Sequence, residues 1–246
     1  MSWKNLIHIG TSGWNYEHWK GPFYEENCPE DKFLEYYIQT FQTVEINNTF
    51  YGLPEEKTLE SWKKTVPDDF IFSVKANRYI THMKKLKDPR DPVANFMSRI
   101  KILADNLGPI LFQLPPNWNF NGQRLQNFLR VLPDGFDYTF ELRNPSWLNE
   151  DTLGLLKDFK SAFCIYEFED RVTDLHQTTD FVYIRLHGPD GAYQGKYDYE
   201  TVHWWAEQII GWAKAGTEVY CYFDNDQHGF APQNAVELLE VVGEMN

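Results

Sequence analysis

The sequence predicts an α/β protein, a single TIM-like (β/α)8 barrel that occupies residues 1–246 as one domain. Short apolar runs of strand length alternate along the chain with segments of helical period, and eight such runs are present. No repeat, low-complexity tract or Ser/Gly-rich linker marks a domain boundary. Strict alternation of strand and helix indicates a parallel sheet, and eight units favour closure of that sheet into a barrel.

Each expected strand is a short run rich in aromatic, β-branched or other apolar residues. In chain order the eight segments are 6–10, 43–51, 70–76, 110–114, 138–143, 163–168, 181–187 and 218–223. An open doubly wound sheet is the alternative arrangement, but the phosphate-binding turn G-x-G-x-x-G of such folds does not follow the first strand.

Helix starts lie between most of these strands, where a capping residue or a proline precedes acidic or helix-forming residues. They are found at residues 54–56, 91–92, 149–151, 198–200 and 231–232. Residues 169–180, between the sixth and seventh strands, are too few for a full helix and its connections. We therefore expect a reduced or irregular crossover there.

The chain is acidic, with 23 basic and 36 acidic residues and a net charge of −13. This charge repels polyanions at long range, which argues against a dedicated nucleic-acid-binding protein. Residues 75–101 are a local exception, since they contain eight basic and two acidic residues. A solvated helix face and loop is the simpler interpretation of that segment, and attraction of phosphate or a nucleic-acid strand is the alternative.

We expect a soluble, cytoplasmic protein without a membrane partner. The longest apolar stretches have strand length, and residues 1–5 lack the basic-then-apolar order of a signal peptide. The three cysteines, Cys28, Cys164 and Cys221, are an odd number at wide spacings, which favours a reducing compartment. The sequence carries no signal for an oligomeric state.

Polar residues of one parity on the strands are candidates for the barrel interior, because side chains alternate between the interior and the surrounding helices. On the second strand this alternation separates Glu45, Asn47 and Thr49 from Val44 and Ile46. On the other strands it selects Lys75, Gln113, Glu141, Arg143, Arg185, His187 and Asp224. The sixth strand has no clear polar face and is left out of the predicted site.

These polar residues lie late in their strands, at the end where barrel enzymes carry their active sites. Burial of any one charge alone would cost several kcal/mol, so acidic and basic groups must pair with each other, with a ligand or with water. A functional site at one mouth of the barrel is the favoured interpretation. A purely structural ion network is the alternative.

Seven ordered motifs carry a family resemblance. Residues 10–14, 45–51, 72–75, 111–116, 141–147, 183–188 and 222–226 are GTSGW, EINNTFY, FSVK, LFQLPP, ELRNPSW, YIRLHG and YFDND. Together they resemble the YecE-like family, also called domain of unknown function 72, over nearly the whole chain.

This resemblance implies a TIM-like barrel with a polar pocket at the strand ends, distantly similar to the barrels of endonuclease IV and xylose isomerase. It implies no reaction. The chain departs from the family at the sixth strand, where members often carry an aspartate-containing segment and this sequence has CIYEFE from Cys164 to Glu169.

The chemistry of the predicted site favours an enzyme that uses general acid/base catalysis on a small substrate bearing phosphate or carboxylate. Arg143, Arg185 and Lys75 would bind the anion, because guanidinium forks and ammonium groups suit such ligands. Glu45, Glu141 and His187 would move protons. The further predicted substrate contacts are Asn47, Gln113, Asp224 and the aromatic residues Trp14, Tyr51, Trp147 and Tyr193.

Several of these residues have a structural alternative. His187 before Gly188 is equally typical of a hydrogen-bonded core histidine, and the aromatic residues are equally typical of satellite cores. Residues 188–197, with three glycines and two tyrosines, are the best candidate for a mobile loop over the site.

Other functions stay open. The first is a nucleic-acid-binding module, and the second is a metal-assisted phosphodiester hydrolase. No cofactor or metal is predicted, because no H-E-x-x-H or zinc-type cysteine spacing is present, although Glu45, Glu141, His187 and Asp224 could converge on a divalent ion. The third is a glycoside hydrolase, but barrel glycosidases commonly use strands four and seven, where this chain has Gln113 and His187.

Overall fold

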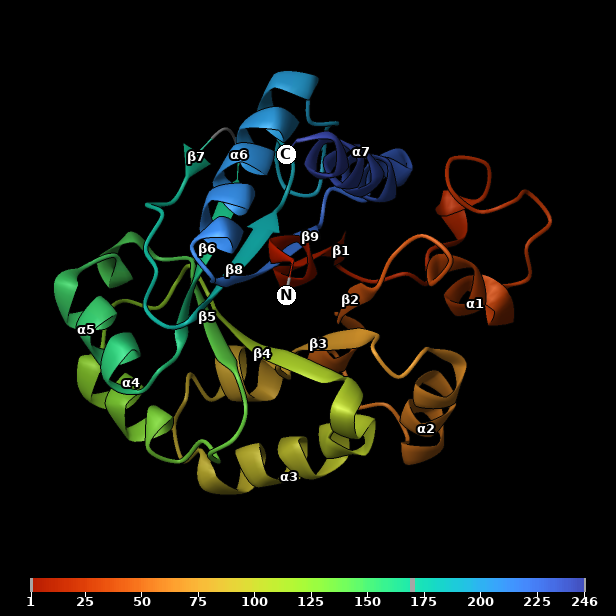
Figure 1. Ribbon diagram of the computed structural model, residues 1–246. Helices are drawn as coiled ribbons and strands as arrows, with labels where there is room; N and C mark the ends of the chain where they lie inside the picture. The colour runs from red at the N-terminus through yellow and green to blue at the C-terminus, as the bar shows by residue number, and fades with distance from the viewer. Residues whose placement is uncertain (1, 169–170, 246) are drawn as a thin grey trace. The chain divides into compact units, whose positions relative to one another are not determined.

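The computed structural model describes residues 2–168 and 171–245 (Figure 1). Met1 and Asn246 of the predicted domain lie outside this range. So do Glu169 and Asp170 of the expected crossover.

The eight predicted strands are all present. They are β1 (Ile7–Thr11), β2 (Thr43–Ile46), β3 (Ile71–Lys75), β4 (Leu107–Leu114), β5 (Tyr138–Leu142), β6 (Ala162–Phe168), β8 (Phe181–Leu186) and β9 (Glu218–Phe223). The sheet order is β1-β9-β8-β6-β5-β4-β3-β2, and a single parallel bridge joins Ser12 to Glu45 beyond β1. The fold is therefore α/β, with a nearly closed parallel barrel of eight strands, as predicted.

The crossover between β6 and β8 is irregular, as predicted. It contains β7 (Arg171–Val172), which pairs antiparallel with β6 through Glu167 and Phe168. The described part of this crossover contains no α-helix.

Within the described residues, six α-helices lie in the other connections and a seventh follows β9, and each of the five predicted starts lies within about one residue of an observed helix start. They are α1 (Phe33–Tyr37), α2 (Glu56–Thr65), α3 (Arg90–Ile100), α4 (Gly122–Leu129), α5 (Glu150–Asp158), α6 (Tyr199–Lys214) and α7 (Phe230–Glu244). At α6 the side chain of Asp198 accepts a hydrogen bond from the backbone N–H of Thr201 at 2.8 Å, which caps the helix. No helix within the described ranges combines the length and apolarity that a membrane crossing needs.

Short helical segments occupy many of the loops. The 3-10 segments are η1 (Trp3–Leu6), η2 (Glu17–Trp19), η3 (Glu30–Lys32), η4 (Asn48–Phe50), η6 (Lys101–Asn106), η7 (Pro145–Trp147) and η8 (Gln227–Gly229). The segment η5 (Tyr79–Met83) is a π-helix.

The second strand is shorter than predicted. The strand β2 ends at Ile46 instead of residue 51, and η4 follows it. Asn47 and Asn48 favour a turn at this point. The hydroxyl of Thr49 stabilises the turn by donating to the carbonyl oxygens of Ile46 at 3.1 Å and Lys75 at 2.7 Å. Thr49 therefore does not lie on the strand face that the alternation predicted.

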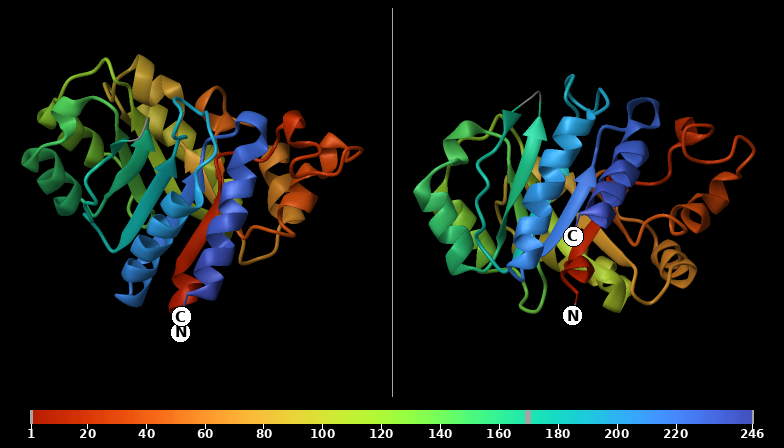
Figure 2. Two further views of the ribbon diagram at one scale, coloured as in Figure 1. Left: turned by 90° about the horizontal axis from the view of Figure 1, so that it is seen from above. Right: turned by 45° about the horizontal axis from the view of Figure 1, so that its top comes forward.

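The described residues pack as two compact units. The first unit comprises residues 2–45, 165–168, 171–175 and 181–245, and the second comprises residues 46–164 and 176–180. In the first unit, α6 and α7 lie side by side and pack against β1 and β9 (Figure 2). In the second, β3, β4 and β5 carry a core in which the rings of Phe112, Phe128 and Phe140 stack or meet edge to face. That the chain is a single domain stays a prediction.

Candidate functional site

Arg185 of β8 is the centre of a buried ion cluster in the first unit. Its side chain is completely buried. The Nε atom donates to Glu45 Oε2 at 3.0 Å, and Nη2 donates to Glu45 Oε1 at 2.8 Å and to Asp224 Oδ2 at 2.8 Å. Paired, parallel hydrogen bonds of this kind are the strongest contacts that arginine makes with a carboxylate. Arg185 thus binds two carboxylates of its own chain.

The carboxyl ends of four strands bring this cluster together. Arg185 and Leu186 of β8 lie opposite Tyr222 and Phe223 of β9, and the backbone N–H of Asp224 donates to the carbonyl oxygen of Leu186 at 2.8 Å. Ser12 extends β1 and forms the bridge to Glu45 at the end of β2. The predicted gathering of polar residues at the strand ends holds within this unit.

The buried charge of Glu45 is fully compensated by hydrogen bonds. Its Oε1 accepts from Arg185 and from the hydroxyl of Ser12, and its Oε2 accepts from Arg185 and from the hydroxyl of Tyr183 at 2.7 Å. A buried carboxylate would be costly without such partners. These four contacts fix the Glu45 side chain in place.

His187 is completely buried and joins the same network. Its Nδ1 lies 2.9 Å from Asp224 Oδ2, and its Nε2 lies 3.3 Å from Arg185 Nη1. A guanidinium nitrogen can only donate, and an ionised carboxylate can only accept. A ring with its hydrogen on Nδ1 satisfies both contacts, so Asp224 holds the tautomer that leaves Nε2 as the acceptor.

Tyr193 lies against the ring of His187, in the loop that the sequence marks as mobile. The two ring centroids are 5.9 Å apart, and Tyr193 is 44% exposed. The Tyr193 N–H donates to the carbonyl oxygen of His187 at 2.7 Å. Tyr193 is therefore an exposed residue that contacts the buried His187 ring, while the mobility of the loop stays a prediction.

Two features shape this loop, residues 188–197. Gly188 has a φ of +110°, and a Cβ atom there would lie 2.1 Å from the carbonyl oxygen of Gln194, so only glycine fits. At the other end, Asn234 of α7 accepts from the Tyr197 N–H and donates to the Tyr197 carbonyl oxygen, both at 3.0 Å. The loop is held at both of its ends.

A second, smaller polar cluster lies in the second unit. The register pairs Gln113 of β4 with Glu141 of β5. The carboxylate of Glu141, which is completely buried, accepts from Gln113 Nε2 at 2.9 Å and from Arg143 Nε. Arg143, predicted to bind an anion, is therefore paired with a carboxylate of β5, the strand that it directly follows.

Lys75, the remaining predicted anion ligand, is buried in the second unit. Its Nζ lies 4.7 Å from the ring centroid of Phe50. The nearby His82 has its pKa lowered from 6.5 to about 4, chiefly by burial and then by the charges of Lys75 and Arg78. A local excess of positive charge thus surrounds His82.

Comparison with known proteins identifies the family. The family model described as protein of unknown function DUF72 matches residues 8–246. The chain belongs to the DUF72 family. The resemblance carried by the seven motifs is confirmed.

Relatives of this DUF72 chain occur in several bacteria. The UPF0759 protein YecE of Escherichia coli K12 is 32% identical over 146 residues, which cover 58% of this chain and 50% of YecE. The chain thus matches half the length of YecE. The UPF0759 protein YunF of Bacillus subtilis is 24% identical over 274 residues, and this match covers 96% of this chain and 95% of YunF.

A solved structure supports the fold. A DUF72 family protein from Thermotoga maritima has a TM-score of 0.88 and 28% sequence identity, and the match covers 97% of this chain and 99% of that chain.

The predicted aromatic contacts of this DUF72 chain have very different surroundings. Trp147 is completely buried and donates its indole N–H to the Trp118 carbonyl oxygen at 2.7 Å, so it packs as a core residue. Trp14 is 6% exposed, whereas Tyr51 is 75% exposed on the surface. Their predicted role in binding substrate stays a prediction, and burial favours the core alternative for Trp147 and Trp14.

Asn47 has an unusual environment in the second unit. It precedes η4, and its side-chain Oδ1 is buried without a hydrogen-bond partner among the described residues. Such acceptors are rare, because each one costs free energy.

Sequence reasoning missed the residues beside Asp224. Tyr16 donates its hydroxyl hydrogen to the Ser12 carbonyl oxygen at 2.9 Å, and burial followed by the charges of Asp224 and Asp226 raises its pKa. Burial, and then the charge of Asp224, also raise the pKa of Asp226. The motifs GTSGW and YFDND contain or border these positions and could have indicated them.

Glu167 of β6 was missed for a different reason. Its side chain is buried and accepts a hydrogen bond from the Trp205 indole N–H of α6 at 2.9 Å. The sixth strand shows no polar alternation, because Glu167 stands alone among apolar and aromatic neighbours. Only the packing of α6 reveals its partner.

No metal site emerges from the geometry. Within residues 2–168 and 171–245, no three side chains of His, Cys, Asp or Glu come together in an arrangement that could hold a metal ion. The predicted convergence on a divalent ion gains no support, and metal dependence stays a prediction.

Proposed function

We propose that this DUF72 chain is an enzyme that moves protons on a small polar substrate by general acid/base catalysis, with His187 as the proton carrier. One observation carries the proposal. The buried chain of contacts from His187 through Asp224 and Arg185 to Glu45 is the arrangement that orients an imidazole for proton transfer.

Each member of the network has a separate task in this proposal. Asp224 holds the hydrogen of His187 on Nδ1, which directs the lone pair of Nε2 away from the carboxylate. Arg185 keeps the carboxylate of Asp224 in place, and Glu45 in turn anchors Arg185. His187 accepts a substrate proton at Nε2 once that atom exchanges its long contact with Arg185 for the substrate.

The cluster also bears on the substrate. Glu45 and Asp224 share one guanidinium, so the first unit has no surplus positive charge at this point. The expectation that Arg185 binds a substrate anion is therefore replaced by a role in holding carboxylates. A phosphate or carboxylate on the substrate would need a cation other than Arg185.

Glycoside hydrolysis is less well supported. That reaction needs one carboxylic acid and one carboxylate that are free to act on the sugar. Glu45 accepts four hydrogen bonds, and Asp224 is bound by both Arg185 and His187. Proton transfer by His187 requires the release of only one long contact, the one between His187 Nε2 and Arg185 Nη1.

Solvent hydrogen exchange tests the proposal without knowledge of the full reaction. Purified protein is incubated in D2O with a panel of hydroxyketones, sugar phosphates and hydroxy acids, and the loss of C–H signals is followed by proton NMR. We expect exchange with at least one class of compound, and a slowing of about 10²- to 10⁴-fold in His187→Gln.

The matched control is His203→Gln, since His203 is a partly exposed histidine of α6 that lies beside Glu207 and Tyr199 and not in the His187 network. It should keep the wild-type rate. Exchange that proceeds equally fast in folded His187→Gln, or the absence of exchange with every compound, would overturn the proposal.

A further inference from the structure

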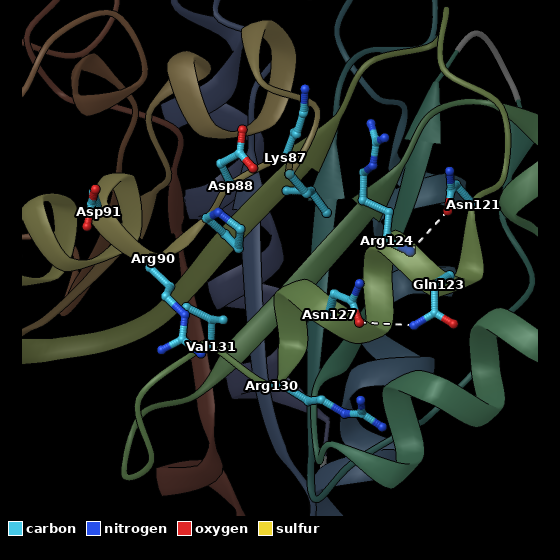
Figure 3. A pocket seen from close by; sticks show the side chains of 12 residues that line it. Lys87, Asp88, Arg90, Asp91, Asn121, Gln123, Arg124, Asn127, Arg130 and Val131 are labelled. Atoms are coloured by element: carbon cyan, nitrogen blue, oxygen red, sulfur yellow. Dashed lines mark hydrogen bonds between the residues drawn. The ribbon is translucent and has the colours of Figure 1, made fainter.

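The second unit contains an open groove between α4 and the loop that precedes α3 (Figure 3). Its volume is about 880 Å³. One wall consists of residues 86–91, and the other consists of Asn121, Gln123, Arg124, Asn127, Arg130 and Val131. Volumes of several hundred Å³ are typical of small-molecule sites.

The groove concentrates positive charge on an acidic protein. Its cationic side chains come from both walls and are Lys87, Arg90, Arg124 and Arg130. In the part of the chain that the structure describes, none of these four side chains has an ion-pair partner. In Figure 3 the side chains of Lys87 and Arg124, from opposite walls, extend in the same direction.

Amide and acidic groups complete the lining. Gln123 and Asn127 of α4 are joined by a hydrogen bond of 3.0 Å from Nε2 to Oδ1. The acidic residues of the groove are Asp88 and Asp91, and Asp88 lies 3.8 Å from Lys84 outside the groove. Cations outnumber acids in the groove, whereas the chain as a whole has a net charge of −13.

The wall that precedes α3 has a strained backbone. Lys85, Leu86 and Asp88 have φ values of +47°, +61° and +44°, although none of them is glycine. Bulky residues seldom adopt this left-handed conformation, and it is found disproportionately at functional sites. The π-helix η5, a form that is also frequent at functional sites, lies directly before this segment.

We propose that this groove binds a small phosphorylated molecule with two or more phosphate groups. Arginine forks bind phosphate through paired hydrogen bonds, and four cations without ion-pair partners match a ligand with several negative charges. The net charge of the chain repels an extended polyanion at long range, which favours a small ligand over a nucleic acid. The lining of this groove shares no residue with the His187 cluster.

Calorimetric titration with inorganic tripolyphosphate at low salt tests the proposal. We expect one binding site per chain and weakening by at least about tenfold in the double variant Arg124→Gln with Arg130→Gln. The charge-matched control is Lys64→Gln with Lys157→Gln, two exposed lysines of α2 and α5 in the same unit. The control should change the affinity less than about twofold.

Two further variants keep the test informative if the double variant is unstable. Asp88→Asn removes a negative charge, and asparagine tolerates positive φ, so it should bind tripolyphosphate more tightly. His187→Gln should bind it as the wild type does, which separates this proposal from the proposed function. No binding of tripolyphosphate, equal weakening in the control, or tighter binding of single-stranded DNA with affinity that grows with strand length would overturn the proposal.

Discussion

Arg185 holds two buried carboxylates at once, and this arrangement decides what the predicted site residues can do. The buried charges of Arg185, Glu45 and Asp224 stabilise one another. Removal of one charge would leave the others without compensation, so the cluster is stable only when all three are present. The same set aligns His187, so stability and orientation depend on the same contacts.

Removal of Arg185 should therefore be costly. We expect Arg185→Gln to lower the free energy of unfolding by about 3–5 kcal/mol, because it leaves two buried carboxylates without their shared cation. Urea denaturation at neutral pH measures the change. Arg130→Gln, an exposed arginine of the groove, is the control and should stay within about 0.5 kcal/mol of the wild type. Equal midpoints for Arg185→Gln and the wild type would contradict the interpretation.

His82 should make stability depend on pH. Burial and the charges of Lys75 and Arg78 lower its pKa from 6.5 to about 4 in the folded chain. Between these two values the unfolded chain binds the proton and the folded chain does not, so this contribution to stability is present above pH 6.5 and is lost as the pH falls towards 4.

We expect His82→Gln to flatten the fall in melting temperature across that pH window. Thermal unfolding of both proteins at several pH values measures the difference. His203→Gln, in which a partly exposed histidine is replaced, should keep the wild-type slope. Parallel curves for His82→Gln and the wild type would count against the lowered pKa.

At the scale of elements, the ends of the strands and the loops after them determine the site. The strands β8 and β9 are paired in parallel register, so Arg185, His187 and Asp224 lie close together at the carboxyl ends of these strands. The loop after β8 then returns across His187 because its backbone turns at Gly188. A substitution in this turn should therefore alter the loop over His187, although the residues of the ion cluster stay the same.

Gly188→Ala tests the turn. A methyl group would lie 2.1 Å from the Gln194 carbonyl oxygen at a φ of +110°, so we expect a loss of stability of about 1–3 kcal/mol and faster amide exchange in residues 188–197. Gly211→Ala is the matched control, since a Cβ atom at this position of α6 meets nothing within 4 Å and should stabilise the helix by up to about 1 kcal/mol. Hydrogen exchange by mass spectrometry and thermal unfolding distinguish the two outcomes.

The element boundaries show where sequence patterns lose accuracy. The apolar runs predicted all eight strands, because a buried parallel strand needs apolar residues on both faces. The pattern continued past Ile46, but the turn at Asn47 and Asn48 ended β2 there. The turn preference of Asn47 and Asn48 outweighed the alternation of polar and apolar residues. The sequence pattern therefore placed Thr49 on a strand face, although Thr49 lies in η4, after β2 has ended.

At the scale of the whole molecule, charge is distributed unevenly. A chain with a net charge of −13 places one cluster of compensated charges at the strand ends of its first unit and an uncompensated basic groove on its second. The basic segment 75–101 indicated such an exception, but it contributes only Lys87 and Arg90 to the four cations. Arg124 comes from α4, and Arg130 directly follows that helix.

By itself, the sequence determined the α/β class, the eight strands, the irregular crossover and the family, because periodicity and ordered motifs are properties of the chain. It also determined which parity is polar on the strands that contribute Glu45, Lys75, Gln113, Glu141, Arg185 and Asp224, but not on the sixth strand. Only the tertiary structure decided which charges pair and that Arg185 binds Glu45 and Asp224 rather than being available to a substrate anion. It also decided that α4 faces the loop before α3. The physical reason is that alternation specifies the direction of a side chain, whereas a hydrogen bond depends on the position of its partner, and distant segments meet only when the chain folds.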